Sequence, residues 1–275
     1  MTVADTGVPT MPPLAERFAN RGLDWIVPQW PAPSSVQAFV TTRNGGVSQG
    51  LRASLDLGHA TGHGATPEET VAIAENRRRV AAFLPAVPHW LEQVHGADVR
   101  IVHARDADDA PPPRADAAVT RDADVVLAVR VADCLPVLLA AVDGSVVGVA
   151  HAGWRGLAAG VVERTIEAME IAPSRIVAWL GPAIGKDAFE VGRDVFEAFT
   201  PDDTSARAAF ARLPSGKWLA DLEALARIRL VRSGVSSVHG GGHCTVSDPA
   251  RFYSYRRDRV TGRMGAFIWR AAPRP

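Results

Sequence analysis

The sequence DVVLAVRVADCLPVLLAAVDGSVVGVAHAGWRGLAAGVVERTIEAME, residues 124–170, decides the fold of this chain. Two short apolar runs rich in β-branched residues, 125–131 and 135–141, predict β-strands. Asp143-Gly144 is typical of a hairpin turn, because glycine adopts a positive φ at no steric cost. A third strand is expected over 146–150, so the second and third strands should form an antiparallel hairpin.

This hairpin brings together the polar residues at the ends of its strands. If the strands pair about the turn, residues 134–136 lie opposite residues 151–153, because register fixes the partner of each residue. Cys134 and His151 are therefore expected to be neighbours. A glycine turn follows His151, and apolar residues at helical spacing then predict an amphipathic helix. The residues expected on its buried face are Val161, Val162, Thr165, Ile166 and Met169.

Composition excludes several classes of protein. The chain has 275 residues, 47% of them hydrophobic, and a formal net charge of zero. It can bury a sizeable core, and its charge gives no argument for a nucleic-acid or membrane partner. It begins without the basic and apolar regions of a signal peptide, and two cysteines make no disulfide framework. We expect a cytoplasmic protein, and the sequence indicates no protein partner.

The organisation of the chain favours one large domain. Residues 1–20 are expected to form a disordered tail, since this segment begins rich in Pro and Thr. Residues 21–275 are then a single catalytic domain. Further strands are predicted over 89–95, 252–255 and 263–269. Hairpins are frequent and regular βα alternation is not clear, so we expect an α+β fold with mixed β-sheets covered by helices.

Several motifs resemble one known family. ADCLPVLL and GVAHAGWRG are similar to blocks of the multicopper-oxidase-like laccase-domain proteins of the YfiH type. VTTRNGGVSQG, QVHGADV, ADAAVT, WLGPAIG, HCT and FYSYRRDRVTGRMGAFIW follow the order of that family, over roughly residues 39–269. The resemblance implies a β-sandwich-like core flanked by helices, shared with bacterial cytotoxic deamidase domains. It also implies a zinc-dependent purine nucleoside phosphorylase, in a family also named polyphenol oxidase or peptidoglycan editing factor.

The resemblance matches the metal ligands of the family to His95, Cys134 and His151. Two imidazoles and one thiolate suit a catalytic zinc site, which has three protein ligands and one open position. Copper is compatible with these ligand types, but a blue-copper site needs a further axial ligand. We therefore expect Zn²⁺ as the cofactor, with Cu²⁺ as the alternative.

Two arginines and a glutamine are candidate substrate-binding residues. Arg155 lies in a glycine turn that opens a helix, and a guanidinium can bind phosphate through two hydrogen bonds, so Arg155 is expected to bind the anion and to act in catalysis. Taken alone, Arg43 in its glycine turn is an incidental exposed arginine, whereas the resemblance implies substrate binding. Gln93 shares a face with His95 by strand alternation and is expected to contact substrate.

Asp133 and Cys244 are further candidate catalytic residues. Asp133 can orient a ligand or move a proton, or it can simply cap a turn. Taken alone, Cys244 is a small buried residue, and the resemblance implies a thiol in the cleft. The expected substrates are phosphate and a purine nucleoside of the adenosine, inosine and methylthioadenosine class, with adenosine deamination as a side activity.

Three alternatives remain open at this point. Cys134 and His151 could form the nucleophile and base of a hydrolase that edits peptidoglycan precursors. The chain could also be a copper-dependent polyphenol oxidase. The third alternative is a metal-stabilised interaction protein with no enzymatic activity.

Overall fold

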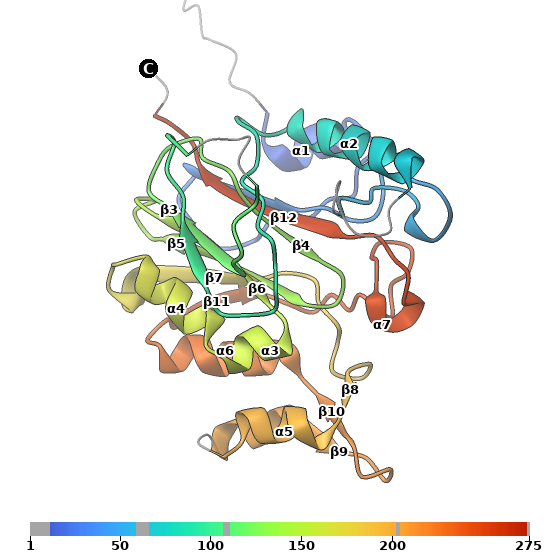
Figure 1. The fold of residues 1–275 in the computed structure, drawn as a ribbon. Coiled ribbons are helices and arrows are strands. Elements are labelled where there is room, and N and C mark those ends of the chain that lie inside the picture. The colour runs from blue at the N-terminus through green and yellow to red at the C-terminus, as the bar shows by residue number, and fades with distance from the viewer. Residues whose placement is uncertain (1–11, 59–65, 107–110, 202–203, 274–275) are drawn as a thin grey trace, which may run out of the picture.

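The computed structural model describes residues 12–58, 66–106, 111–201 and 204–273. Short strands alternate with helices along the described chain, as Figure 1 shows. The elements are α1 (Leu14–Ala19), β1 (Val36–Val40), η1 (Gly50–Arg52), α2 (Pro67–Ala81), β2 (Val99–Ile101), β3 (Ala117–Thr120), β4 (Leu127–Val131), β5 (Leu135–Ala141), β6 (Val147–Ala152), α3 (Trp154–Ala158), α4 (Val161–Ala168), η2 (Pro173–Arg175), β7 (Ile176–Leu180), β8 (Glu190–Val191), α5 (Arg193–Phe199), η3 (Thr204–Ala209), β9 (Phe210–Arg212), β10 (Trp218–Ala220), α6 (Leu222–Arg232), β11 (Ser237–Gly240), α7 (Tyr255–Asp258) and β12 (Met264–Arg270).

Two β-sheets packed face to face form the centre of the fold (Figure 1). The larger sheet has the order β11-β7-β5-β6-β3-β2 and is mixed, because both of its edge pairs are parallel and its inner pairs are antiparallel. The smaller sheet, β1-β12-β4, is antiparallel. The predicted α+β class with a sandwich-like core is confirmed.

Helices cover the outer faces of both sheets, so the domain has four layers. Apolar residues of the two sheets, such as Val129 and Leu138, form the core between them. The opposite face of the larger sheet packs against α4 and α6, and the opposite face of the smaller sheet packs against α1 and α2. Each buried Leu, Val or Phe contributes roughly 1.5–3 kcal/mol, so this double burial explains why the strands are apolar on both faces.

The central hairpin has the predicted register. In β5 and β6, Leu135 pairs with Ala152 and Pro136 pairs with His151. The helix that follows is divided in two, because Gly160 has a φ of 90° between α3 and α4. The five residues predicted for its buried face are all buried against the larger sheet or in the adjoining core. None of the helices in the described part of the chain is long and apolar enough to cross a membrane.

The prediction of a disordered tail over residues 1–20 is wrong for its last part. Residues 14–19 form α1, and Phe18 is only 1% exposed. Such a short helix is unstable alone, so packing of Phe18 against Trp25 and Phe39 must hold it in place. Residues 1–11 lie outside the described residues.

Two predicted strands are wrong. Residues 89–95 make only isolated bridges, at His89 and Glu92, because the chain turns at His95 with a φ of 60°. Residues 252–255 are not a strand either, since Ser254 caps the short helix α7. The strand predicted over 263–269 is confirmed as β12. In both wrong cases, side-chain hydrogen bonds override the local apolar pattern: the distant Asp116 fixes the turn at His95, and Ser254 caps its own helix.

A third, small sheet, β8-β10-β9, projects from the domain together with α5 (Figure 1). Phe196 of α5 stacks on Trp218 of this sheet, with ring centroids 4.8 Å apart. Phe189, directly before β8, lines a cavity at the end of the central hairpin.

Candidate metal centre and active site

The central hairpin places Cys134 and His151 at the same end of the larger sheet. His151 is the last but one residue of β6, and Cys134 directly precedes β5. Asp133, with a φ of 92°, makes the turn that leads into Cys134. The hairpin register therefore holds a thiol and an imidazole side by side.

His95 reaches this pair from the loop before β2, and the buried carboxylate of Asp116 fixes that loop. Its Oδ2 accepts hydrogen bonds from the backbone N–H groups of Val94 (3.0 Å) and Gly96 (2.7 Å), and its Oδ1 accepts one from that of His95 (2.9 Å). Oδ1 also accepts a hydrogen bond from Nδ1 of His151 at 2.8 Å. One carboxylate thus fixes the backbone of the loop that carries His95 and, by engaging Nδ1 of His151, leaves Nε2 of that imidazole for the cluster.

The three donor groups lie close enough to share a metal ion. One ligand atom from each of His95, Cys134 and His151 lies within 4.8 Å of the others. A Cβ at Gly153 would lie 2.8 Å from Sγ of Cys134 and 3.3 Å from the His95 ring, so only glycine leaves this space open. Tetrahedral zinc with bonds of about 2.0–2.3 Å needs ligand atoms about 3.3–3.8 Å apart, which small side-chain movements supply. The donor set therefore fits a zinc ion.

The charges of the cluster support each other. Burial alone would raise the pKa of Cys134, but the charge and hydrogen bonds of His151 and His95 outweigh it and lower that pKa to about 6. Burial alone would lower the pKa of His151, but the Cys134 thiolate and the Asp116 carboxylate raise it to about 9. Without a metal, the site therefore stabilises a thiolate beside an imidazolium, and the thiolate is the form that binds metals.

A cavity of about 550 Å³ opens beside this cluster. Its lining combines the metal-ligand candidates with arginines and with aromatic and apolar side chains. The lining residues are Gln93, His95, Arg130, Ala132, Asp133, Cys134, His151, Gly153, Trp154, Arg155, Ile184, Phe189, Leu222, Tyr255, Arg256, Arg259 and Arg263.

Three further residues singled out in the sequence line this cavity: Gln93, Asp133 and Arg155. Gln93 uses both ends of its amide on the backbone of Arg130, at 2.8 Å each, so it acts as a strand partner there. Asp133 accepts a hydrogen bond from Oγ1 of Thr245 and one from the backbone N–H of Arg256, both at 2.6 Å. Arg155 is exposed, and its guanidinium lies 4.4 Å from the ring centroid of Trp154.

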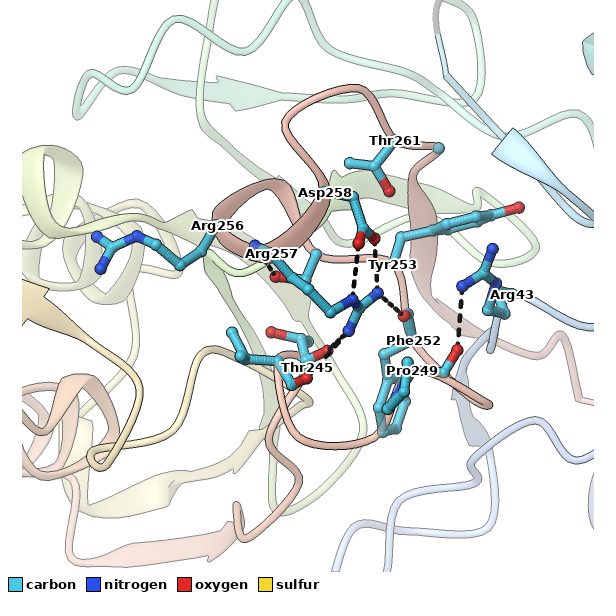
Figure 2. A network of polar contacts seen from close by, with 12 residues as sticks. Arg43, Thr245, Pro249, Phe252, Tyr253, Arg256, Arg257, Asp258 and Thr261 are labelled. Carbon is cyan, nitrogen blue, oxygen red and sulfur yellow. Dashed lines mark hydrogen bonds and ion pairs between the residues drawn. The ribbon is translucent and has the colours of Figure 1, made fainter. Parts of the chain in front are cut away.

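Arg43 lies away from the lining, which corrects its expected position. Its guanidinium donates hydrogen bonds to the backbone oxygens of Ala53 (2.6 and 3.0 Å) and Pro249 (3.0 Å). It also lies 4.7 Å from the ring centroid of Tyr253, as Figure 2 shows. Arg43 therefore joins the glycine-rich loop after β1 to the segment before α7.

Cys244 is also absent from the lining. Its Sγ accepts a hydrogen bond from the backbone N–H of Gly185 at 3.2 Å. Burial tends to raise its pKa, but hydrogen bonds from Ser247 and neighbouring backbone groups lower that pKa overall. The adjacent Thr245, rather than Cys244, contacts a cavity residue, because its hydroxyl bonds Asp133.

Sequence reasoning missed several residues of the site. Asp116 belongs to ADAAVT, a motif that was noted without assigning a role to its acid. An aspartate directly before a run of buried small residues is a signal for a buried, hydrogen-bonded carboxylate. The arginines and the tyrosine of FYSYRRDRVTGR gave a weaker signal, since nothing in that motif shows which side chains face the cavity. The residues concerned are Asp116, Arg130, Thr245, Tyr255, Arg256, Arg259 and Arg263.

Comparisons with known proteins agree with this architecture. A family model described as multi-copper polyphenol oxidoreductase laccase matches residues 37–271. The chain is 49% identical over 253 residues to a purine nucleoside phosphorylase of Xylella fastidiosa, covering 89% of this chain and 96% of that protein. It is 48% identical over 246 residues to purine nucleoside phosphorylase YfiH of Escherichia coli, covering 89% and 98%.

Two solved structures share the fold. A protein of Neisseria meningitidis gives a TM-score of 0.83 at 48% identity, covering 90% of this chain and all of that one (100%). YlmD from Geobacillus stearothermophilus gives a TM-score of 0.80 at 34% identity, covering 87% and 93%.

Proposed function

Because this chain belongs to the multi-copper polyphenol oxidoreductase laccase family, and similar proteins of that family are named purine nucleoside phosphorylase, we propose that it is a zinc-dependent purine nucleoside phosphorylase. Its substrates are phosphate and a nucleoside of the adenosine, inosine and methylthioadenosine class. The observation that carries the proposal is one cavity lined by a His-Cys-His donor set, several arginines and several aromatic side chains.

The donor set favours zinc over copper. His95, Cys134 and His151 leave one position open, as catalytic zinc sites do. A blue-copper site would need an axial donor such as Met or Gln; the described lining contains no Met, and both ends of the Gln93 amide are bonded to the backbone of Arg130. A bound zinc ion supplies positive charge that holds and polarises an oxygen ligand.

Side chains of the cavity account for substrate binding. Trp154, Phe189 and Tyr255 offer aromatic faces against which a purine ring can stack, and Arg155 offers a guanidinium for phosphate. In the proposed reaction, a phosphate oxygen bonds to C1′ of the ribose as the C1′–N9 bond breaks. The electron pair of that bond goes to N9.

The proton for the leaving purine comes from the phosphate. A hydrogenphosphate dianion carries one proton, and its transfer to the purine leaves ribose 1-phosphate as the dianion, so atoms and charge balance. Asp133 is the alternative carrier of this proton, because each of its oxygens accepts one hydrogen bond and keeps a second lone pair. His151 is held by Asp116 at Nδ1 and would bind the zinc ion through Nε2, so neither of its nitrogens would be available as a base.

The stabilised thiolate of Cys134 favours one second candidate. Cys134, His151 and Asp116 have the order of nucleophile, base and orienting carboxylate, which would suit a hydrolase acting on peptidoglycan precursors. In that reaction Sγ of Cys134 would attack the carbonyl carbon of an amide, and the C–N bond would break as His151 gives a proton to the leaving amine. Water would then hydrolyse the thioester, and activity would not need a metal. The zinc proposal makes the opposite prediction, because a ligated thiolate is a poor nucleophile.

The test is a nucleoside panel assayed with and without phosphate, with bound zinc and copper quantified on the same sample. The proposal predicts release of free base only when phosphate is present, with ribose 1-phosphate formed in equal amount. Ammonia release from adenosine would reveal a deaminase side activity. Oxidation of a phenol by a copper-loaded sample that leaves every nucleoside intact would overturn the proposal.

A cytoplasmic location agrees with the two free thiols of Cys134 and Cys244.

A further inference from the structure

The cavity carries positive charge that the protein itself does not neutralise. Arginines 130, 155, 256, 259 and 263 line it, and Asp133 is the only carboxylate in the lining. Both oxygens of that carboxylate accept hydrogen bonds from other groups. Guanidinium groups keep their charge in proteins, so the lining favours an anionic ligand.

Three of the five guanidinium groups are engaged by backbone carbonyls. Arg130 donates to the oxygen of Leu91 at 2.7 Å, and Arg256 donates to the oxygen of Glu190 at 2.9 Å. Arg263 donates to the oxygens of residues 261 and 262. Among the described residues, the guanidinium of Arg259 makes no hydrogen bond or ion pair, and Arg155 only stacks on Trp154. Arg155 and Arg259 are therefore the two arginines of the lining whose guanidinium groups donate no hydrogen bond to the described residues.

Arg259 has an unfavourable backbone conformation for an arginine. It follows the last residue of α7 with a φ of 62°, and its N–H donates to the oxygen of Tyr255 at 2.9 Å. Its ψ is −59°, so this is not the left-handed cap that commonly ends helices, but a positive φ is uncommon for any residue other than glycine. An exposed arginine whose guanidinium makes no hydrogen bond or ion pair with the described residues, at a position that favours glycine, points to a role in ligand binding.

The segment that carries Arg259 is tied down on its inner side. Arg257 donates hydrogen bonds to the oxygens of Thr245 (2.7 Å) and Phe252 (3.0 Å) and pairs with Asp258 at 2.7 Å, as Figure 2 shows. The carboxylate of Asp133 accepts the N–H of Arg256 from the same helix. Since Asp133 directly precedes Cys134, it connects this helix to the metal-ligand strand end.

We infer that Arg259 is a specificity-determining residue that binds the phosphate dianion in this cavity together with Arg155, and that Asp133 is the positioning residue that fixes its helix. The identity of the anion as the attacking phosphate rests on the proposed function. The same chemistry would accept a phosphate carried by the substrate, such as a nucleoside 5′-phosphate.

The experiment measures binding of inorganic phosphate and, separately, of adenosine 5′-phosphate by calorimetry on the zinc-loaded protein, without turnover. Arg259→Gln is expected to weaken phosphate binding about 10-fold or more, since a charge-assisted hydrogen bond is worth about 1.5–3 kcal/mol. Arg259→Lys, which keeps the charge, should retain an intermediate affinity. Arg193→Gln, on the exposed face of α5 and paired with Glu197, is the matched control and should bind as the unaltered protein does.

Zinc content and thermal unfolding check that each variant folds. If Arg259→Gln does not fold, Arg259→Gly replaces it, because glycine removes the guanidinium and accepts the positive φ. In turnover, the KM for phosphate should rise while the KM for the nucleoside changes less than about threefold.

If Arg259→Gln binds both inorganic phosphate and adenosine 5′-phosphate within about threefold of the unaltered protein, the inference is overturned. A loss confined to adenosine 5′-phosphate would uphold an anion site at Arg259 but assign it to the phosphate of a substrate rather than to the attacking phosphate. Weakened phosphate binding in a protein that catalyses no phosphorolysis would uphold the anion site and reject the proposed function.

Discussion

Replacing Asp116 with Asn should disrupt the metal centre without touching any of its three ligands. Each oxygen of this carboxylate accepts two hydrogen bonds: Oδ2 from Val94 and Gly96, and Oδ1 from His95 and His151. An amide has only one oxygen, so its NH₂ group must face two donors. If it faces Val94 and Gly96, the loop loses two hydrogen bonds. If it faces His95 and His151, the imidazole must change tautomer and present a protonated Nε2 to the cluster.

The magnitude follows from these contacts. Two lost hydrogen bonds to a charged group cost about 1.5–3 kcal/mol each, so the free energy of unfolding should fall by about 3–6 kcal/mol. Loss of the group that orients a ligating histidine should weaken zinc binding about 10- to 100-fold. Both effects come from one substitution in a side chain that is fully buried (0% exposed).

The pH dependence has a definite sign. Burial alone would raise the pKa of Asp116, but hydrogen bonds from His151 and the backbone N–H groups outweigh it and lower that pKa. Because the pKa of Asp116 is lower in the folded protein than in the unfolded chain, its carboxylate stabilises the fold at pH values above the unfolded pKa of about 3.9. This stabilisation is lost as the pH falls through the pKa of the folded protein. The free energy of unfolding of the unaltered protein should therefore exceed that of Asp116→Asn by the whole amount at pH 7, and this difference should decrease below about pH 4.

The assay combines denaturant unfolding of the metal-free proteins with zinc competition against a chelator. Asp98→Asn is the matched control, because that carboxylate is exposed and makes only a 3.4 Å contact with Arg164. Asp98→Asn should leave both the free energy of unfolding and the zinc affinity nearly unchanged. Zinc affinity within about threefold of the unaltered protein, together with an unchanged unfolding midpoint, would refute the role assigned to Asp116.

Four further predictions concern individual side chains. Cys134→Ser should lose both zinc and turnover, because a neutral hydroxyl is a weak zinc ligand; stoichiometric zinc in that variant, measured by mass spectrometry of the intact protein, would contradict this. In metal-free protein carrying Cys244→Ser, alkylation of Cys134 should rise with pH about a midpoint near 6, and zinc should suppress it; a midpoint near the usual value of about 8.5 would oppose the stabilised thiolate. Asp133→Asn should keep its phosphate affinity within about threefold, since the amide oxygen can accept from Arg256 and the NH₂ group can donate to Thr245. Asp133→Ala should bind phosphate about 10-fold more weakly. Lost turnover with intact phosphate binding in the Asn variant would assign proton transfer to Asp133. Arg43→Gln should lower the free energy of unfolding by about 1–3 kcal/mol and leave calorimetric phosphate binding unchanged; a 10-fold loss of binding would return Arg43 to the substrate site.

The centre of the fold could be predicted from the sequence because several local patterns there indicate the same structure. β-branched runs, an Asp-Gly turn and helical spacing determine the hairpin of β5 and β6, and its register alone makes Cys134 and His151 neighbours. The partner of β12, by contrast, lies more than 200 residues away in β1, and no local pattern specifies that pairing.

Side-chain roles were harder to predict than strands, because tertiary hydrogen bonds decide them. Arg43 and Gln93 both carry N–H groups that could bind a substrate, yet these groups donate hydrogen bonds to backbone oxygens instead. The turn at His95 depends on Asp116, which lies 21 residues away, and so its positive φ cannot be read from the local apolar alternation. Arg259 contributes to no periodic pattern, and only its place in the cavity singles it out.

The most direct test of the central claim is turnover after removal of the metal, with mass spectrometry of protein trapped during the reaction. The account predicts that chelation abolishes phosphate-dependent release of the purine base, that added zinc restores it, and that Cys134 carries no substrate adduct in either state. Undiminished activity in metal-free protein, with an adduct on Cys134, would contradict the account and establish the cysteine hydrolase.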